Sequence, residues 1–327
     1  MDKVRVALIG AGGMANAVHY PSLASFADVE LVAICDLDAE KLKKTAEKFK
    51  IPKTFSSYKT MLTETKPDAV YALMPPYVLF DVAMDVLDSG HNLFIEKPPA
   101  ATTHQTICLA KKAEDKKLVT AVGFQRRYHP FVHHCFEKVK AVGQPHQVVS
   151  HFLKATNVGP NYPYYRGAID LFHCDGIHAV DALRYYCGLA DVKAVASDVR
   201  NLDSWYPLSF NALVYFANDA VGILHVNWRT GARSLKFEFH AAGASSYVDA
   251  DGAGEVLYAT EKDPVVKTNY TDFVNSKEAF MTQGFWHENR AFIDAIKSGK
   301  QVHNNLQDSV KSMELCDLIL ANAINKR

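Results

Sequence analysis

The sequence predicts an α/β protein of two domains: a doubly wound parallel sheet in residues 1–124, and an α+β domain in residues 125–327 whose open sheet is mainly antiparallel. Strands and helices alternate up to about residue 124, which is typical of a parallel sheet covered by helices. The first strand ends in a glycine-rich turn that leads directly into a helical pattern. From residue 192 onward, β-rich stretches follow one another with only turn residues between them, which indicates antiparallel strands.

The glycine-rich turn at residues 10–15 has the pattern G-x-G-x-x-A. It follows a short apolar run, 4–9, that suits a parallel strand buried on both faces. Gly10 permits the tight turn, Gly12 lets the backbone approach a pyrophosphate, and Ala15 keeps the new helix close to the strand. Amides at the helix start, together with the helix dipole, favour the charge of a phosphate. The turn therefore predicts a dinucleotide site.

An acidic residue supports the same interpretation. The strand expected at 30–36 places Asp36 at its carboxyl end, about 20 residues beyond the turn, as the dinucleotide fingerprint requires. Its carboxylate would accept hydrogen bonds from the ribose hydroxyls and repel a 2′-phosphate, so we expect NAD rather than NADP. The alternative is an ordinary crossover in which Asp36 caps the helix at 38–48.

The other elements of the first domain follow at regular spacing. We expect helices at 37–50, 58–65, 78–89 and 103–117, and strands at 53–55, 69–73, 91–95 and 118–124. Met74 and Pro75 come directly after the fourth strand, where proline ends the strand and shapes a loop at the cofactor crevice.

After residue 124 the pattern changes. We expect a helix at 130–142, a strand at 147–154, an irregular aromatic segment at 157–166, a helix to about 187, strands between 192 and 260, and helices at 277–298 and 306–325. Turn signals at 217–219 and 249–252 separate some of the strands. We expect the late helix to pack back on the first domain.

The composition excludes several kinds of partner. Lys plus Arg and Asp plus Glu both number 36, so the formal charge is zero. Nucleic acids and anionic membranes require concentrated positive charge, and neither is expected as a partner. The six cysteines lack paired spacing, as expected of free thiols in a reducing compartment. The N-terminus enters a strand directly and no apolar run approaches the ~20 residues of a membrane span, so we expect a cytoplasmic protein.

Lys97 is the first catalytic candidate. It follows the strand at 91–95, at the sheet edge where open α/β folds bind their ligands. A lysine ammonium at this place can donate to a substrate hydroxyl and stabilise the developing alkoxide. The alternative is a solvated lysine that pairs with Glu96.

His178 is the second candidate, because a histidine can take the hydroxyl proton as hydride departs. Asp175 and Asp181 lie three residues to either side, near enough on a helix to orient the imidazole. The alternative is a hydrogen-bonded packing histidine. His173 and Cys174 also suggest a metal site, but two histidines five apart do not share a helical face well and no Cys-x-x-Cys accompanies them. No metal is expected.

The aromatic segment offers residues for a substrate pocket. Tyr164, Tyr165 and Arg166 would wall it, since aromatic faces stack on the C–H surfaces of sugars. Packing between the domains is the alternative role for this segment. Arg127 would bridge the domains or approach the cofactor.

Four motifs occur in order at fitting distances: G-x-G-x-x-A at 10–15, Glu-Lys-Pro at 96–98, Gly-Phe-Gln-Arg-Arg-Tyr-His-Pro at 123–130, and Asp-Gly-Ile-His-Ala-Val-Asp at 175–181. With these motifs the chain resembles, over its whole length, the family of glucose–fructose oxidoreductase, inositol dehydrogenase and MocA. The resemblance implies an N-terminal Rossmann domain, a C-terminal open-sheet domain, and hydride transfer between a nicotinamide cofactor and a sugar, cyclitol or related polyol. It also implies a homo-oligomer, a dimer or tetramer, that pairs through the open sheet.

The resemblance implies roles for single residues as well. It places Lys97 beside nicotinamide and substrate, with a cis bond to the following proline, and makes His178 the acid/base. Two positions depart from the family: Cys174 stands where members often carry Asp, and Leu79 stands where many have a histidine in the loop after the fourth strand. Asp175 is displaced by one residue, roughly 100° around a helix. It would serve instead if the helix begins differently.

One function and two rivals follow from these inferences. We expect an NAD-dependent dehydrogenase that acts on a secondary alcohol of a sugar or cyclitol. The rivals are a redox-neutral enzyme that oxidises a sugar transiently to process a glycoside, and a regulator that binds NAD without turnover. The catalytic residues expected are Lys97, His178 and Asp175. The cofactor residues expected are Gly10, Gly12, Gly13, Met14, Ala15, Asp36, Met74, Pro75, Glu96 and Lys97, and those expected at the substrate are Arg127, Tyr164, Tyr165, Arg166 and Asp181.

Overall fold

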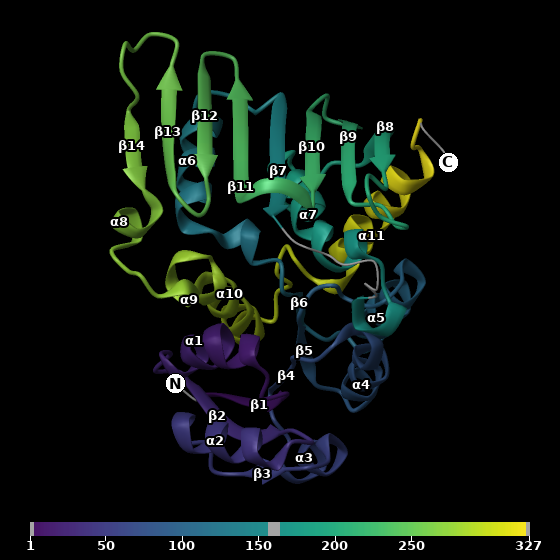
Figure 1. Cartoon of the computed structure of the whole chain (residues 1–327). Coiled ribbons are helices and arrows are strands. Elements are labelled where there is room, and N and C mark those ends of the chain that lie inside the picture. Colours follow the sequence, from purple (N-terminus) through teal and green to yellow (C-terminus); the bar gives the residue numbers. More distant parts are fainter. Residues whose placement is uncertain (1–2, 156–163, 325–327) are drawn as a thin grey trace. The chain divides into compact units, whose positions relative to one another are not determined.

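The computed structural model describes residues 3–155 and 164–324, and the chain divides into two compact units (Figure 1). Unit 1 contains Met1–Gln125 and Glu278–Lys311, and unit 2 contains Arg126–Lys277 and Ser312–Arg327. The sequence predicted a boundary after residue 124 and a late helix that packs back on the first domain. The returning segment of unit 1 is Glu278–Lys311.

Unit 1 is built on a six-stranded parallel sheet in the order β3-β2-β1-β4-β5-β6, which confirms the predicted doubly wound sheet. The strands are β1 (Val4–Ile9), β2 (Val29–Cys35), β3 (Thr54–Phe55), β4 (Ala69–Ala72), β5 (Asn92–Ile95) and β6 (Thr120–Val122). The connecting helices are η1 (Ala15–His19), α1 (Tyr20–Ala24), α2 (Ala39–Phe49), α3 (Tyr58–Thr65), α4 (Pro76–Asp88) and α5 (Thr103–Asp115).

The strand order of this sheet fixes where a ligand can bind. β1 pairs with β2 on one side and with β4 on the other, so the direction of winding reverses beside β1. Val6, Leu8 and all four residues of β4 are buried, which explains the continuous apolar runs of these strands. Open sheets bind ligands at the carboxyl ends of the strands next to such a reversal.

The returning segment 278–311 does not form the single helix predicted over 277–298. Two helices, α9 (Ala279–Thr282) and α10 (Phe285–Ser298), are separated at Gly284. The φ angle of Gly284 is 96°, in the left-handed region that glycine adopts readily and that cannot continue a helix. The helical pattern in the sequence extended across this glycine, and the prediction was therefore wrong.

Aromatic packing and ion pairs hold α10 in unit 1. The Phe292 ring lies 5.6 Å from the Tyr71 ring and 5.7 Å from the Phe94 ring, measured between centroids. Asp28, just before β2, accepts hydrogen bonds from Arg290 Nη1 at 2.8 Å and Lys297 Nζ at 2.6 Å. These hydrogen bonds hold the pKa of Asp28 well below its usual range, because they favour the carboxylate.

Unit 2 contains an eight-stranded sheet in the order β14-β13-β12-β11-β7-β10-β9-β8. β7 and β10 pair in parallel and the other neighbours are antiparallel, so the predicted, mainly antiparallel sheet is confirmed. The strands are β7 (Gln147–Ala155), β8 (Val192–Arg200), β9 (Ser209–Phe216), β10 (Val221–Asn227), β11 (Arg229–Ala241), β12 (Ala244–Asp249), β13 (Ala253–Tyr258) and β14 (Val266–Asn269).

One face of this sheet is packed by helices. α6 (Pro130–Lys140) contacts β11, β12 and β13, and α7 (Ile177–Tyr186) contacts β7 and β10 (Figure 1). Side chains of a strand alternate between its two faces. Three large side chains that alternate with buried neighbours, Leu213, Tyr215 and Tyr247, are 40, 44 and 45% exposed. The second face therefore presents apolar and aromatic groups to solvent.

The helix that carries the last motif begins irregularly. A π-helical turn, η4 (Phe172–Gly176), precedes α7. Short helices η2 (Gln125–Tyr128), η3 (Tyr164–Gly167) and α8 (Tyr270–Val274) complete the chain, together with α11 (Leu306–Ala321), which ends earlier than the predicted residue 325. Residues 157–163 of the predicted aromatic segment, and residue 325 itself, lie outside the described residues. No helix in the described part of the chain is long and apolar enough to cross a membrane.

Candidate active site

The turn after β1 has the geometry that the dinucleotide pattern requires. Gly10 has a φ angle of 111°, and a β-carbon on it would overlap the carbonyl oxygen of Leu73. A β-carbon on Gly12 or Gly13 would meet no protein atom within 4 Å, so open space lies beside these two residues. Ala15 is buried against the sheet, as a small residue at the helix start should be. The open space beside the glycines fits a phosphate group.

Two residues that the sequence reasoning missed hold this turn in place. Tyr20 donates its hydroxyl to the Gly10 carbonyl at 2.9 Å, and burial raises its pKa far above the usual range, so that it remains a donor. Asn16 Nδ2 donates to the carbonyls of Ala11 at 3.0 Å and Gly12 at 3.2 Å. An asparagine and a tyrosine inside a helical pattern carry no signal that distinguishes these roles from packing.

Asp36 ties the end of β2 to the glycine turn. Its Oδ2 accepts from the Ala11 amide at 2.6 Å and its Oδ1 accepts from the Asp38 amide at 2.8 Å. The residue that caps α2 is Asp38, which accepts from the amides of Glu40 and Lys41. A carboxylate has about four lone-pair sites, so two amide bonds leave acceptor capacity for ribose hydroxyls. The geometry fits the expected role.

The helix after β4 begins two residues earlier than predicted. Met74 and Pro75 follow the strand, and Pro75 is the exposed residue that precedes α4. Leu79, where many family members have a histidine, lies inside α4 and is buried. The proline-rich junction starts the helix at Pro76 because proline is well tolerated in the first helical turn, so the loop is shorter than predicted.

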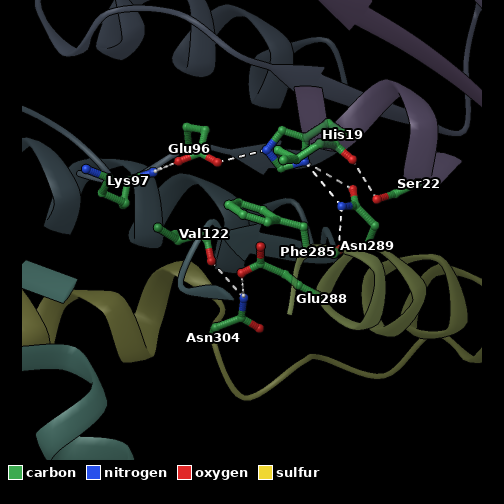
Figure 2. A network of polar contacts seen from close by, with 10 residues as sticks. His19, Ser22, Glu96, Lys97, Val122, Phe285, Glu288, Asn289 and Asn304 are labelled. Atoms are coloured by element: carbon green, nitrogen blue, oxygen red, sulfur yellow. Dashed lines mark hydrogen bonds and ion pairs between the residues drawn. The ribbon is translucent and has the colours of Figure 1, made fainter. Parts of the chain in front are cut away.

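Glu96 and Lys97 follow β5 at the same edge of the sheet. The bond from Lys97 to Pro98 is cis, as the family resemblance implied. The Glu96 carboxylate is held by the protein: Oε2 accepts from the Lys97 amide at 3.1 Å, and Oε1 lies 2.8 Å from His19 Nε2 (Figure 2). Glu96 therefore faces protein groups with both of its oxygens.

In unit 2, Asp175 and His178 lie on consecutive helical turns. His178 is in α7, 8% exposed, with its ring 6.2 Å from that of Phe152. Asp175 is in η4 and forms an ion pair with Lys154 of β7. Lys154 was not predicted, because a lysine at a strand end has no distinguishing pattern in the sequence.

The π-helical turn bears on the choice between Cys174 and Asp175. The estimate that Asp175 is displaced by about 100° assumes 3.6 residues per turn, and this does not hold in the wider π-helix. The Cys174 side chain is buried, whereas the Asp175 carboxylate is 13% exposed and reaches Lys154. Which of the two completes the catalytic trio stays a prediction, with Asp175 favoured by its accessible charge.

Arg127 and Asp181, expected at the substrate, bind each other in the interior of unit 2. Arg127 Nε and Nη2 donate to the two Asp181 oxygens at 2.8 and 2.5 Å, and both side chains are at most 1% exposed. Ser312 Oγ donates to Asp181 at 2.7 Å, and Arg184 Nη1 donates to Ser312 Oγ at 2.8 Å. This buried carboxylate, bonded by Arg127 and Ser312, holds α7 in place within unit 2. The substrate role of Arg127 and Asp181 stays a prediction.

His173 makes two contacts that sequence reasoning had not foreseen. Its Nδ1 lies 2.6 Å from Asp170 Oδ2 and its Nε2 lies 3.0 Å from Asp317 Oδ1. Burial lowers its pKa, but the two carboxylates outweigh burial and raise it above the usual value. Within residues 3–155 and 164–324, no group of three or more His, Cys, Asp or Glu side chains could hold a metal ion.

Of the predicted aromatic wall, only part lies within the described side chains. Tyr164, Tyr165 and Arg166 belong to η3. Tyr165 is 40% exposed and its φ angle is 45°, an uncommon conformation for a tyrosine that turns the chain sharply at this point. The substrate role of these residues stays a prediction.

Residues 4–124 match the sequence profile of the oxidoreductase family described by its NAD-binding Rossmann fold. The chain is 30% identical over 199 residues to the D-glucoside 3-dehydrogenase of Escherichia coli K12, a match that covers 59% of this chain and just over half, 56%, of that protein. It is 23% identical over 331 residues to the D-xylose 1-dehydrogenase (NADP(+)) 2 of Haloferax volcanii, covering 97% of this chain and 96% of that protein. The solved levoglucosan dehydrogenase in complex with NADH shares the fold, with a TM-score of 0.82, 18% identity and coverage of 98 and 97%.

The contacts of His173 predict a pH dependence of stability. A pKa raised in the folded state means that the contribution is full below the unfolded value of 6.5 and is lost as pH rises through the folded value. His173→Gln should therefore lower the thermal midpoint most at about pH 5.5 and hardly at all at about pH 9. Both carboxylates are more than half exposed, so we expect about 1 kcal/mol, or roughly 2–4 °C. A midpoint difference that grows with pH would contradict the ion-pair interpretation.

Proposed function

Because the chain belongs to the family of glucose–fructose oxidoreductase, inositol dehydrogenase and MocA, we propose that it is an NAD-dependent oxidoreductase of a sugar, cyclitol or related polyol. The observation that carries this proposal is the turn after β1, where open space beside Gly12 and Gly13 meets the helix start and the Asp36 carboxylate. A dinucleotide site has three parts: space for the pyrophosphate, amides at a helix start that bind it, and an acidic residue that binds the ribose.

Different residues of unit 1 would bind different parts of the cofactor. The amides of residues 10–15 would hold the pyrophosphate, and Asp36 would accept the adenosine ribose hydroxyls. Met74 and Pro75, at the carboxyl end of β4, would border the cofactor further along the same sheet edge. The nicotinamide, when bound, supplies the hydride acceptor for alcohol oxidation.

Lys97 and His178 carry the proton and charge chemistry in this proposal. The Lys97 ammonium donates a hydrogen bond to the substrate hydroxyl and stabilises negative charge on its oxygen. His178 accepts the hydroxyl proton as the carbon gives up its hydride. Asp175, held by Lys154, stabilises the protonated imidazole through its negative charge. In the reverse direction the same groups return the proton to the oxygen.

The names of the relatives support a sugar substrate. The D-glucoside, D-xylose and levoglucosan dehydrogenases all act on sugars or sugar derivatives by name. The exposed Tyr165 beside the chain reversal of η3 offers an aromatic face of the kind that stacks on sugar C–H groups. Secondary alcohols of such compounds are the substrates that the proposed lysine and histidine chemistry suits.

We also propose that the chain forms a homo-oligomer through the open face of the unit 2 sheet. This face presents Leu213, Tyr215 and Tyr247, and exposed apolar groups on the face of a sheet that no helix covers favour association. A second copy offers the same surface, and symmetric pairing through one shared surface is the commonest form of oligomer.

Sedimentation velocity measures this association. Leu213→Glu places like charges on both copies at a two-fold interface and should shift the mass distribution toward the monomer. Leu318→Glu is the matched control, since Leu318 is also 40% exposed but lies on α11. A monomeric wild-type protein, or equal effects of the two variants, would rule out the open face as the interface.

Asp36 predicts a preference for NAD. Titration with both cofactors should show tighter binding of NAD, because the carboxylate accepts ribose hydroxyls and repels a 2′-phosphate. Asp36→Ser keeps an acceptor but removes the charge, so the preference should shrink by roughly tenfold, the effect of about 1.4 kcal/mol. Equal or tighter binding of NADP by the wild-type protein would show that Asp36 does not contact the ribose.

Lys97 and His178 predict a loss of turnover without loss of cofactor. With a panel of sugars and polyols, Lys97→Ala and His178→Ala should each lower kcat by ~10²–10⁴-fold, the usual contribution of acid–base catalysis. NAD affinity should change little, because the glycine turn holds the pyrophosphate. The double variant should lose less than the product of the single losses, since both groups act on one oxygen.

The outcomes of this experiment separate the rival functions. Near-normal turnover in His178→Ala would mean that another residue takes the proton, with Asp175 the first suspect. Cys174→Asp is informative as well: a gain in rate would show that the natural chain lacks part of the trio. A wild-type protein that binds NAD but turns over none of the panel would favour the regulator.

A further inference from the structure

A buried chain of polar groups lies behind Lys97 (Figure 2). We propose that His19, acting through Glu96, is a positioning residue for Lys97; the inference rests on the proposed role of Lys97 in the reaction. Two contacts make the chain: His19 Nε2 lies 2.8 Å from Glu96 Oε1, and Glu96 Oε2 accepts from the Lys97 amide at 3.1 Å. Glu96 thus fixes the backbone of Lys97, and His19 fixes Glu96.

The neighbouring strand leaves Glu96 little freedom. Gly123 follows β6, and its amide donates to the Ile95 carbonyl at 2.8 Å. A β-carbon on Gly123 would lie 2.9 Å from Glu96 Cδ and 3.0 Å from both carboxylate oxygens. The carboxylate therefore occupies the space that a side chain at position 123 would take, and it is confined between β6 and His19.

Both ring nitrogens of His19 have polar partners. A carboxylate only accepts, so the Nε2 of His19 must carry the hydrogen that bonds to Glu96. The other ring nitrogen, Nδ1, lies 3.2 Å from Asn289 Nδ2 and 3.3 Å from Asn289 Oδ1. The same Asn289 Nδ2 donates to the Phe285 carbonyl at 2.7 Å. Asn289 of α10 therefore holds the imidazole from the side opposite Glu96.

The surroundings of His19 make these bonds consequential. The ring is fully buried, and the rings of Phe94, Phe285 and Tyr71 lie 5.2, 5.8 and 6.1 Å from it. Hydrogen bonds are stronger in a buried environment without water. If one partner of such a bond is removed, no water molecule replaces it, and the remaining partner stays without a hydrogen bond. Packing alone would be better served here by an apolar side chain.

His19 also connects Lys97 to the cofactor turn. It is the last residue of η1, which begins at Ala15 of the glycine turn. The Glu96 carboxylate bonds to the Lys97 backbone, and Figure 2 shows the Lys97 side chain extending away from that carboxylate. The backbone of Lys97 is thereby fixed relative to the glycine turn. A displacement of about 1 Å at a reacting group can cost roughly 10²-fold in rate, so this fixation matters.

The test measures the environment of Lys97 directly. Cyanate modifies the neutral form of an amine, so the rate of modification of Lys97, followed by peptide mass spectrometry across pH, reports its charge environment without any substrate. Four proteins are compared: wild type, His19→Leu, His19→Gln, whose side-chain amide keeps a donor near the Nε2 position, and the matched control Glu288→Gln. Glu288 is a buried acid of the same unit, and its Oε1 accepts from Asn304 Nδ2 at 3.3 Å.

We expect His19→Leu to change the Lys97 rate at a given pH by roughly threefold or more, because the carboxylate loses its donor and moves relative to the lysine. His19→Gln should stay close to wild type, and Glu288→Gln should leave the Lys97 profile unchanged although it replaces a buried carboxyl group. In turnover with sugars and polyols, His19→Leu should lower kcat about tenfold or more while the NAD dissociation constant stays within about twofold.

An unchanged Lys97 profile in folded His19→Leu would overturn the positioning role, and so would equal changes in His19→Leu and Glu288→Gln. Should His19→Leu fail to fold, Glu96→Gln takes its place, since it keeps the volume and removes the charge, and an unchanged profile there is equally decisive. A profile that responds to His19 while Lys97→Ala retains turnover would sink the proposed catalysis by Lys97 and leave the positional link intact.

Discussion

The close approach of β1 to β4 is the constraint on which the cofactor half of this molecule depends. β1 lies between β2 and β4, and where it ends the backbone passes so near the Leu73 carbonyl that no side chain fits on residue 10. The same passage brings the Ala11 amide onto Asp36 and opens the space beside Gly12. One steric requirement therefore positions the open space beside the glycines, the Asp36 carboxylate and the start of η1 together.

A second close approach occurs at a glycine after β6. Gly123 makes room for the Glu96 carboxylate, and Glu96 in turn contacts the Lys97 amide and His19. Buried polar groups are tolerated only when they are hydrogen-bonded, so the Asp36 and Glu96 carboxylates each fix a backbone amide, of Ala11 and of Lys97. The two sites are connected through η1, which carries the turn at one end and His19 at the other.

In unit 2 a buried ion pair fixes the position of a helix, where unit 1 relies on close approaches at glycines. Arg127 and Asp181 form a buried pair that Ser312 completes, and this pair anchors α7, the helix of His178. Breaking one partner of such a pair leaves an uncompensated buried charge, which makes the geometry of the helix difficult to change. The Lys154–Asp175 pair lies nearer the surface, with side chains 19 and 13% exposed.

The sequence by itself determined the fold class and the cofactor turn, because strand periodicity and glycine spacing are local properties of the chain. It placed Lys97 and Asp36 at the carboxyl ends of their strands, and His178 in a helix, for the same reason. Only the tertiary structure decided that Asp181 faces Arg127, that Glu96 faces His19, and that the returning segment of unit 1 begins at 278. Arg127 and Asp181 are 54 positions apart in the sequence, and His19 and Glu96 are 77 positions apart. Contacts between residues so distant in the chain leave no periodic pattern in a single sequence. The break at Gly284 and the π-helical turn before α7 escaped prediction as well, since packing selects them among conformations that the local sequence equally permits.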